Sequence, residues 1–116
     1  MSGAYLQKQV LTPELASEYT RFAWSPGAGA ALIQHARSYD ADRSALLPTL
    51  ANVRAPALVV WTHADPWFPV SVGCKLRDLL PSAELTIIDN AGHLPREEQP
   101  TNFAMAVLDC LSANSL

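Results

Sequence analysis

Two short apolar runs constrain the fold of this chain more than any other feature. The first, Ala57–Trp61, lies between a proline and a polar turn, and the second, Leu85–Asp89, is followed by Asn-Ala-Gly. Short continuous apolar runs of this kind are typical of strands that are covered on both faces. Between them, a helical pattern runs from Val72 to Leu80, with Ser71 as a possible cap and Pro81 as its end. This order predicts two parallel strands joined by a helical crossover.

Each predicted strand leads to one polar residue at its carboxyl end. Asp65 follows the first strand within one turn, and His93 follows the second after the turn formed by residues 90–92. Catalytic groups in open parallel sheets gather outside the carboxyl ends of the strands, so we expect these two side chains to meet. A carboxylate that orients an imidazole forms two members of a nucleophilic triad. In that arrangement Nδ1–H of His93 donates to Asp65, and Nε2 is free to take a proton.

The motifs around these residues resemble those of the C-terminal part of the α/β-hydrolase fold family. In that family the acid follows a late strand in a D-x-x-x-P motif, here Asp65–Pro69, and the histidine lies in an A-G-H-x-P-x-x-E-x-P motif, here Ala91–Pro100. The resemblance spans about Arg54 to Leu111. It implies an α/β fold with two parallel strands and flanking helices. It also implies hydrolysis of a small ester or related substrate by a nucleophile–His–Asp triad.

The residues before the first strand read as helical. Thr12 caps a helix that starts with Pro13 and continues to about Trp24. Ser25-Pro26 repeats this start signal, so we expect Ser25 to cap a second helix over Gly27–Tyr39, followed by a polar linker over Asp40–Thr49. In the family this position is occupied by the end of a helical lid. The resemblance therefore divides the chain into a lid remnant, 1–45, and the C-terminal part of the core, 46–116.

The last predicted helix runs from Pro100 to about Leu111, with apolar residues at helical spacing. Glu97 and Glu98 precede it and read as first-turn charges that favour its positive end. Asp89 ends the second strand and reads as a turn residue rather than as the acid. A metal site formed by His63, Asp65 and His93 lacks a fourth ligand, so we predict no metal and no other cofactor.

The nucleophile of a triad is the missing part. The segment Ala23–Gly27 imitates the family's G-x-S-x-G motif, but Pro26 has no backbone N–H to offer an oxyanion, and the preceding residues read as helix. Cys74 and Cys110 fall in helical patterns and read as reduced, buried side chains. The predicted catalytic residues are therefore only Asp65 and His93. We expect a truncated form of a hydrolase with weak or no activity of its own.

A non-catalytic assembly module is the alternative. Two parallel strands make a poor independent sheet, and the strand at Ala57–Trp61 lacks an earlier neighbour. Its free edge predicts pairing with a second copy of the chain or with a separate N-terminal half.

Composition and charge limit the remaining function classes. The 116 residues are 49% hydrophobic and 16% charged, which suits one compact domain. The net charge is −3 and no basic cluster occurs, so nucleic acid is not an expected partner. The start of the chain lacks the apolar core of a signal peptide, and no apolar run has the length of a membrane span. We therefore expect a cytoplasmic protein without a membrane partner, and a small-molecule substrate if the chain is active.

Overall fold

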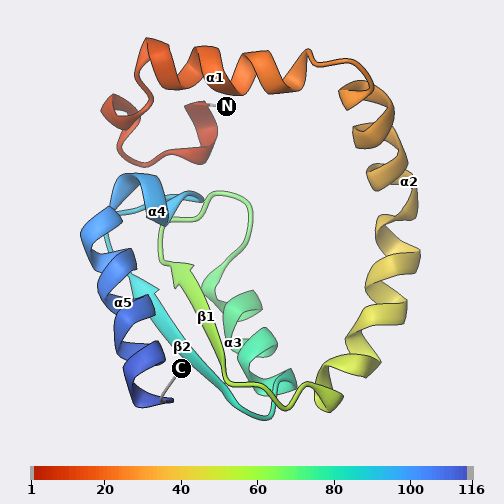
Figure 1. The fold of residues 1–116 in the computed structure, drawn as a ribbon, viewed down its shortest axis with the longest axis vertical. Helices are drawn as coiled ribbons and strands as arrows, with labels where there is room; N and C mark the ends of the chain where they lie inside the picture. Colours follow the sequence, from red (N-terminus) through yellow and green to blue (C-terminus); the bar gives the residue numbers. More distant parts are fainter. Residues whose placement is uncertain (1, 115–116) are drawn as a thin grey trace.

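The computed structural model describes residues 2–114 (Figure 1). Its elements, in chain order, are two 3₁₀ turns (Ser2–Ala4 and Lys8–Val10), helices α1 (Pro13–Ala23) and α2 (Ala28–Leu46), a 3₁₀ segment (Leu47–Asn52), strand β1 (Ala57–Thr62), helix α3 (Val70–Leu79), strand β2 (Ala83–Ile88), and helices α4 (Pro95–Glu98) and α5 (Pro100–Ala113).

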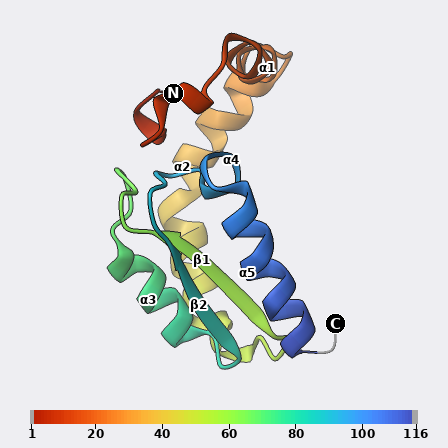
Figure 2. The same ribbon diagram turned by 90° about the vertical axis from the view of Figure 1, so that its left-hand side faces the viewer.

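The α/β unit is a two-stranded parallel sheet between two helices. Residues of β1 and β2 pair in register from Ala57 opposite Ala83 to Thr62 opposite Ile88. Helix α3 covers one face of the sheet and α5 covers the other (Figure 2). The parallel pair and its helical crossover, predicted from the apolar runs, are confirmed.

Side chains of β1 alternate between these two helices, as the pleat of a strand requires. Trp61 packs against α3 at Gly73, where an added Cβ would lie 2.8 Å from the indole ring. Leu58 and Val60 face an apolar groove that Phe103 and Val107 of α5 also line. The strand is thus apolar on both faces because both faces meet a helix.

Helices α1 and α2 leave the α/β unit and arch beside it (Figure 1). Helix α1 starts as predicted, with the Thr12 hydroxyl accepting the backbone N–H of Leu15 at 3.2 Å. Neither helix contains a buried residue, and Leu32 of α2 is 68% exposed. The apolar residues of these helices therefore do not form a core with the rest of residues 2–114.

The predicted cap at Ser25 is wrong. Helix α2 begins at Ala28, and its cap position is Gly27, which adopts a left-handed conformation with φ of 86°. The Ser25 hydroxyl instead donates to the carbonyl of Phe22, in the last turn of α1. Glycine turns the chain here because it alone adopts this conformation without steric cost.

The predicted linker over Asp40–Thr49 is also wrong. Helix α2 continues through Leu46, and a 3₁₀ segment follows it directly. The residues concerned are mostly good helix formers, and the first helix breaker is Pro48, so polarity alone was a misleading sign. Helix α3 likewise starts at Val70 after Pro69, which places Ser71 inside the helix rather than at its cap.

Most of the buried residues lie near the carboxyl ends of the strands. Ala4 and Tyr5, from the start of the chain, are buried together with Val59, Ile88 and Ala91. The N-terminal segment thus packs where both strands end. Within the described residues, no helix combines the length and the apolar character needed to cross a bilayer.

Candidate functional site

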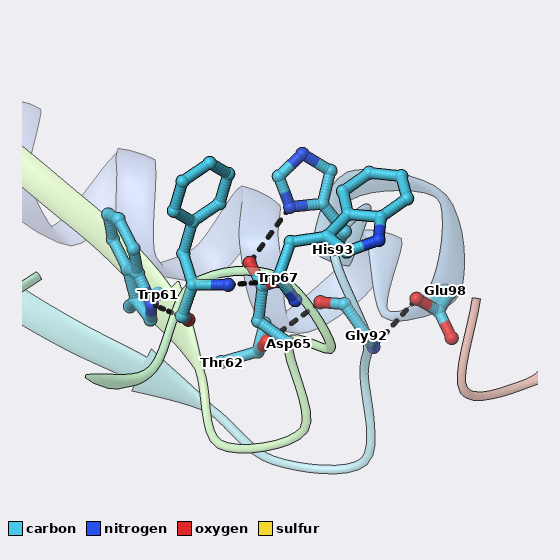
Figure 3. A network of polar contacts seen from close by, with 8 residues as sticks. Trp61, Thr62, Asp65, Trp67, Gly92, His93 and Glu98 are labelled. Carbon is cyan, nitrogen blue, oxygen red and sulfur yellow. Dashed lines mark hydrogen bonds and ion pairs between the residues drawn. The ribbon is translucent and has the colours of Figure 1, made fainter. Parts of the chain in front are cut away.

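The two candidate catalytic side chains lie in contact at the carboxyl ends of the strands (Figure 3). Nδ1 of His93 is 2.8 Å from Oδ2 of Asp65. The side chain of Asp65 is 8% exposed and that of His93 is 32% exposed. The loop after β1 carries the acid and the turn after β2 carries the histidine, so the contact predicted from the two motifs is present.

The other carboxylate oxygen of Asp65 closes the loop that carries it. Oδ1 accepts the backbone N–H groups of Trp67 at 2.8 Å and Phe68 at 3.0 Å. Burial of Asp65 acts to raise its pKa, but the hydrogen bonds from His93 and from these two N–H groups outweigh burial and lower the pKa. Asp65 is therefore ionised at neutral pH.

An ionised carboxylate only accepts hydrogen bonds, so the proton of a neutral His93 ring resides on Nδ1. This leaves the lone pair of Nε2 available to a proton donor. The arrangement can act as a general base, and the carboxylate stabilises the imidazolium that forms when the base is protonated.

Aromatic side chains form a wall beside the histidine. The ring centroid of Trp67 lies 4.6 Å from that of His93, and the centroid of Phe68 lies 5.8 Å away. Trp67 is 55% exposed, so much of its ring faces solvent. Trp61 Nε1 donates to the carbonyl of Phe68 at 3.0 Å and fixes this loop to β1. A hollow of about 120 Å³ lies against Asp65, Phe68 and His93.

A larger hollow, about 370 Å³, lies between β2 and α5. It is lined by residues such as Glu84, Met105 and Asp109, and neither Asp65 nor His93 borders it. The smaller hollow is therefore the one that a substrate of the acid–histidine pair would use.

The predicted role of Glu97 and Glu98 as first-turn charges of the last helix is wrong. Both residues belong to the short helix α4, and Glu98 is buried at 5% exposure. Its carboxylate accepts the backbone N–H of Gly92 at 2.7 Å. Glu97 accepts hydrogen bonds from the hydroxyls of Tyr5 and Tyr19. Spacing alone did not reveal these partners, because they come from the distant start of the chain.

A second acid–histidine contact lies on the surface. Nδ1 of His63 is 2.8 Å from Oδ1 of Asp89, and both side chains are exposed. His63 thus contacts Asp89 while Asp65 contacts His93, so His63 and Asp65 do not converge on one point. In the part of the chain from residue 2 to residue 114, no group of three or more potential metal ligands is found.

The three nucleophile candidates from the sequence, Ser25, Cys74 and Cys110, do not border the hollow beside Asp65 and His93. Ser25 is in the turn between α1 and α2, at the end of α1 that is farther from α4 (Figure 1). Cys74 and Cys110 are free thiols within α3 and α5. The described residues therefore bring together an acid and a base.

Comparisons with known proteins identify the fold. The chain is 40% identical over 65 residues to 2-hydroxy-6-oxononadienedioate/2-hydroxy-6-oxononatrienedioate hydrolase 1 of Dechloromonas aromatica (strain RCB), and this match covers 56% of the chain and 22% of that protein. The crystal structure of a serine hydrolase involved in carbazole degradation, the CarC enzyme, matches with 36% identity and a TM-score of 0.53, over 55% of the chain and 25% of that structure. The chain has the C-terminal part of an α/β-hydrolase fold.

A second 2-hydroxy-6-oxononadienedioate/2-hydroxy-6-oxononatrienedioate hydrolase, hydrolase 2 of Pseudomonas putida, is 36% identical over 62 residues, or 53% of the chain and 22% of that protein. The chain thus spans 22% of the length of these curated relatives. The structure of CumD, a meta-cleavage product hydrolase, matches 97% of the chain and 43% of its own length with a TM-score of 0.75. At 20% identity this match shows the fold alone. No protein-family model matches the chain.

Proposed function

We propose that this chain supplies the acid and the base of an α/β-hydrolase active site. Asp65 orients His93, and His93 takes a proton from a nucleophile that lies outside the described site. The observation that carries this proposal is the 2.8 Å contact between Nδ1 of His93 and Oδ2 of Asp65 at the strand ends. The parent reaction is hydrolysis of a small ester or related substrate, and the hydrolase names of the relatives support this class.

The chemistry that this geometry serves proceeds in two halves. The nucleophile's hydroxyl transfers its proton to Nε2 of His93 while its oxygen bonds to the substrate carbonyl carbon. The imidazolium then returns that proton to the leaving group as the bond to the leaving group breaks. In the second half, water gives a proton to the same nitrogen as its oxygen bonds to the acyl carbon. The imidazolium then returns that proton to the nucleophile's oxygen as the bond between this oxygen and the acyl carbon breaks, so the acid is released and the nucleophile is restored. Asp65 remains ionised throughout and stabilises the imidazolium in both halves.

We expect the chain by itself to be a weak catalyst. Members of a triad act as a unit, and an acid–histidine pair without a nucleophile and oxyanion donors supplies only general-base assistance to water. Ser25 does not fill this gap, because the residue after it is Pro26, which has no N–H for an oxyanion.

Hydrolysis of p-nitrophenyl acetate by the pure chain tests the proposal. We expect slow turnover, most of which is lost in His93→Ala and retained in Ser25→Ala. His63→Ala is the matched control, because His63 also contacts an aspartate at the same edge of the sheet but is exposed. Equal rates in wild type and His93→Ala, or a loss confined to His63→Ala, would contradict the proposed role of His93.

An assembly module is the second candidate function, and the open edge of β1 favours it. Within the described residues β1 pairs only with β2, and large apolar side chains of α1 and α2 are exposed. The partner would be a second copy or a separate N-terminal half of the hydrolase fold. Size-exclusion chromatography with light scattering tests self-pairing, and a monomer with a sharp unfolding transition would count against it.

The division into a lid remnant, 1–45, and a core part, 46–116, also belongs to this proposal. The arch of α1 and α2 beside the α/β unit supports it, and Leu46 ends the last helix of the lid part. The expected cytoplasmic location stays a prediction.

A further inference from the structure

The peptide group between Gly92 and His93 is held at both ends. Its carbonyl oxygen accepts the hydroxyl of Thr62, at the end of β1, at 2.7 Å. Its N–H, that of His93, donates to the carbonyl of Ala4 at 2.7 Å. The preceding N–H, that of Gly92, donates to Oε1 of Glu98 at 2.7 Å. Three separate segments therefore fix the backbone from which the imidazole projects, and Figure 3 shows the contacts of Thr62 and Glu98 with Gly92.

One of these segments is the N-terminal strap, which we define as residues 4–7. The strap crosses directly over Gly92, where an added Cβ would lie 2.5 Å from the carbonyl oxygen of Ala4 and 2.8 Å from the backbone nitrogen of Leu6. The side-chain amide of Gln7 also donates to the carbonyl of Asn90 at 2.7 Å. A glycine at position 92 is thus required by the close approach of the strap.

Glu98 joins the strap to the histidine turn. While Oε1 accepts the N–H of Gly92, Oε2 accepts the backbone N–H of Gln7 at 2.7 Å. Glu98 is 5% exposed, and a buried carboxylate is costly unless hydrogen bonds compensate it. Each oxygen is satisfied by a different segment, so the carboxylate acts as a bridge between them.

Glu97 adds a second connection from α4 to the start of the chain. The hydroxyls of Tyr5, in the strap, and Tyr19, in α1, both donate to its carboxylate. Tyr5 is buried. The two adjacent glutamates therefore differ in their partners: Glu98 binds backbone N–H groups, and Glu97 binds phenol hydroxyls.

We propose that Glu98 is a positioning residue for His93, and that it acts by clamping the N-terminal strap across the histidine turn so that Nδ1 faces Asp65. This inference rests on the proposed function for the chemistry that the position serves. Its test, however, needs no turnover, so failure of the hydrolase proposal and failure of this one are separate results.

Glu98→Gln is the decisive variant. A glutamine keeps the shape but has one acceptor oxygen and an NH₂ group, which would face a backbone N–H, donor against donor. We expect the His93 and Gly92 amides to exchange about tenfold faster or more, as the loss of one hydrogen bond to a charged group implies. We also expect the ring ¹⁵N shifts of His93 to move from a single Nδ1–H form toward an average of both tautomers.

Glu97→Gln is the matched control, because phenol hydroxyls can accept from an NH₂ group as well as donate to a carbonyl. We expect it to leave the ring shifts of His93 unchanged. Gly92→Ala is the second variant, since it keeps the Glu98 side chain but places a Cβ 2.5 Å from the carbonyl oxygen of Ala4 and 3.1 Å from Oε1 of Glu98, which disrupts the clamp by a direct clash. We expect it to reproduce the loss of the single tautomer.

Unchanged ring shifts and amide exchange at His93 in Glu98→Gln would overturn the proposal. So would a variant in which β1 and β2 lose their protection together with His93, because Glu98 would then support the whole fold rather than the turn. A change at His93 with the strands still protected supports the positioning role.

Discussion

Asp65 illustrates how single residues at this site combine two tasks. One oxygen closes the loop through Trp67 and Phe68, and the other binds the imidazole. The interpretation of Asp65 as an ordinary turn residue and its interpretation as a triad acid are therefore compatible. The turn places the carboxylate, and the carboxylate places the histidine.

The lowered pKa of Asp65 predicts a pH dependence of stability. The ionised form is favoured in the folded state, so its contribution is fully present above the unfolded pKa of about 3.9 and is lost as pH falls through the lower folded pKa. We expect Asp65→Asn to lower the free energy of unfolding by about 2 kcal/mol at neutral pH. Urea unfolding between about pH 6 and pH 3 should show that the difference in the free energy of unfolding between wild type and Asp65→Asn shrinks as pH falls.

Asp109→Asn, at an exposed residue of α5, is the control and should change little. A gap between wild type and Asp65→Asn that stays constant over the whole pH range would show that the charge of Asp65 does not matter to stability.

Two glycines on different helices allow a comparison of packing with helix propensity. Gly73→Ala places a Cβ against the Trp61 ring, so we expect a loss of about 1–3 kcal/mol and a shift in tryptophan fluorescence. Gly29→Ala lies on α2, where no atom is close to the added Cβ, and should be neutral or stabilising by up to about 1 kcal/mol. Equal effects in thermal unfolding would mean that α3 does not pack on β1 as described.

At the scale of elements, the helices divide into two classes. Helices α3 and α5 pack on the sheet, whereas α2 leaves the sheet and is exposed to solvent along almost its whole length. Most helical stability in proteins comes from packing of an apolar face, so α2 depends on propensity and on its two ends. A helix of this kind opens locally at a low free-energy cost, so we expect α2 to be cleaved by proteases earlier than the packed helices.

Limited trypsin digestion measures this difference. We expect cleavage after Arg37 and Arg43 in α2 well before cleavage after Lys75 and Arg77 in α3, although all four side chains are exposed. Mass spectrometry of early fragments identifies the sites. Cleavage in α3 first, or at equal rates, would mean that α2 is covered in solution, and association with a second copy is the first cause to examine.

At the scale of the whole molecule, two apolar surfaces are left uncovered by the rest of residues 2–114. One is the arch of α1 and α2, and the other is the groove beside β1. The groove on the α5 side of β1 is apolar and is lined by Leu58, Val60, Phe103, Val107 and Leu111, among others. In the α/β-hydrolase fold further strands and helices continue the sheet. The second candidate function places a partner on this side of β1 rather than beside β2.

Lysine substitutions on two sides of α5 test that placement. We expect Leu111→Lys, in the groove beside β1, to weaken self-association about tenfold or more, because it puts a charge into an apolar contact. Met105→Lys, in the hollow beside β2, should leave association unchanged. Light scattering across a dilution series measures both, and the reverse ranking would place the interface beside β2.

Local sequence signals predicted the parts of this structure that depend on nearby residues. The apolar runs located both strands, and Thr12-Pro13 located the start of α1. The D-x-x-x-P and A-G-H-x-P motifs located Asp65 and His93, because the direction of parallel strands alone brings their ends together. In these cases the residue and its reason for being there lie within a few positions of each other.

Only the tertiary structure decided the rest. The buried state of Glu98 depends on Gln7 and Gly92, and the constraint on Gly92 depends on Ala4 and Leu6. The length of α2 was misjudged because polar residues in it face solvent rather than ending the helix. Contacts between residues far apart in the chain leave no periodic trace in it, since periodicity records which face of an element is covered and not by what. The sequence by itself therefore determined the strands and the acid–histidine contact, while the strap that holds the histidine turn was visible only in three dimensions.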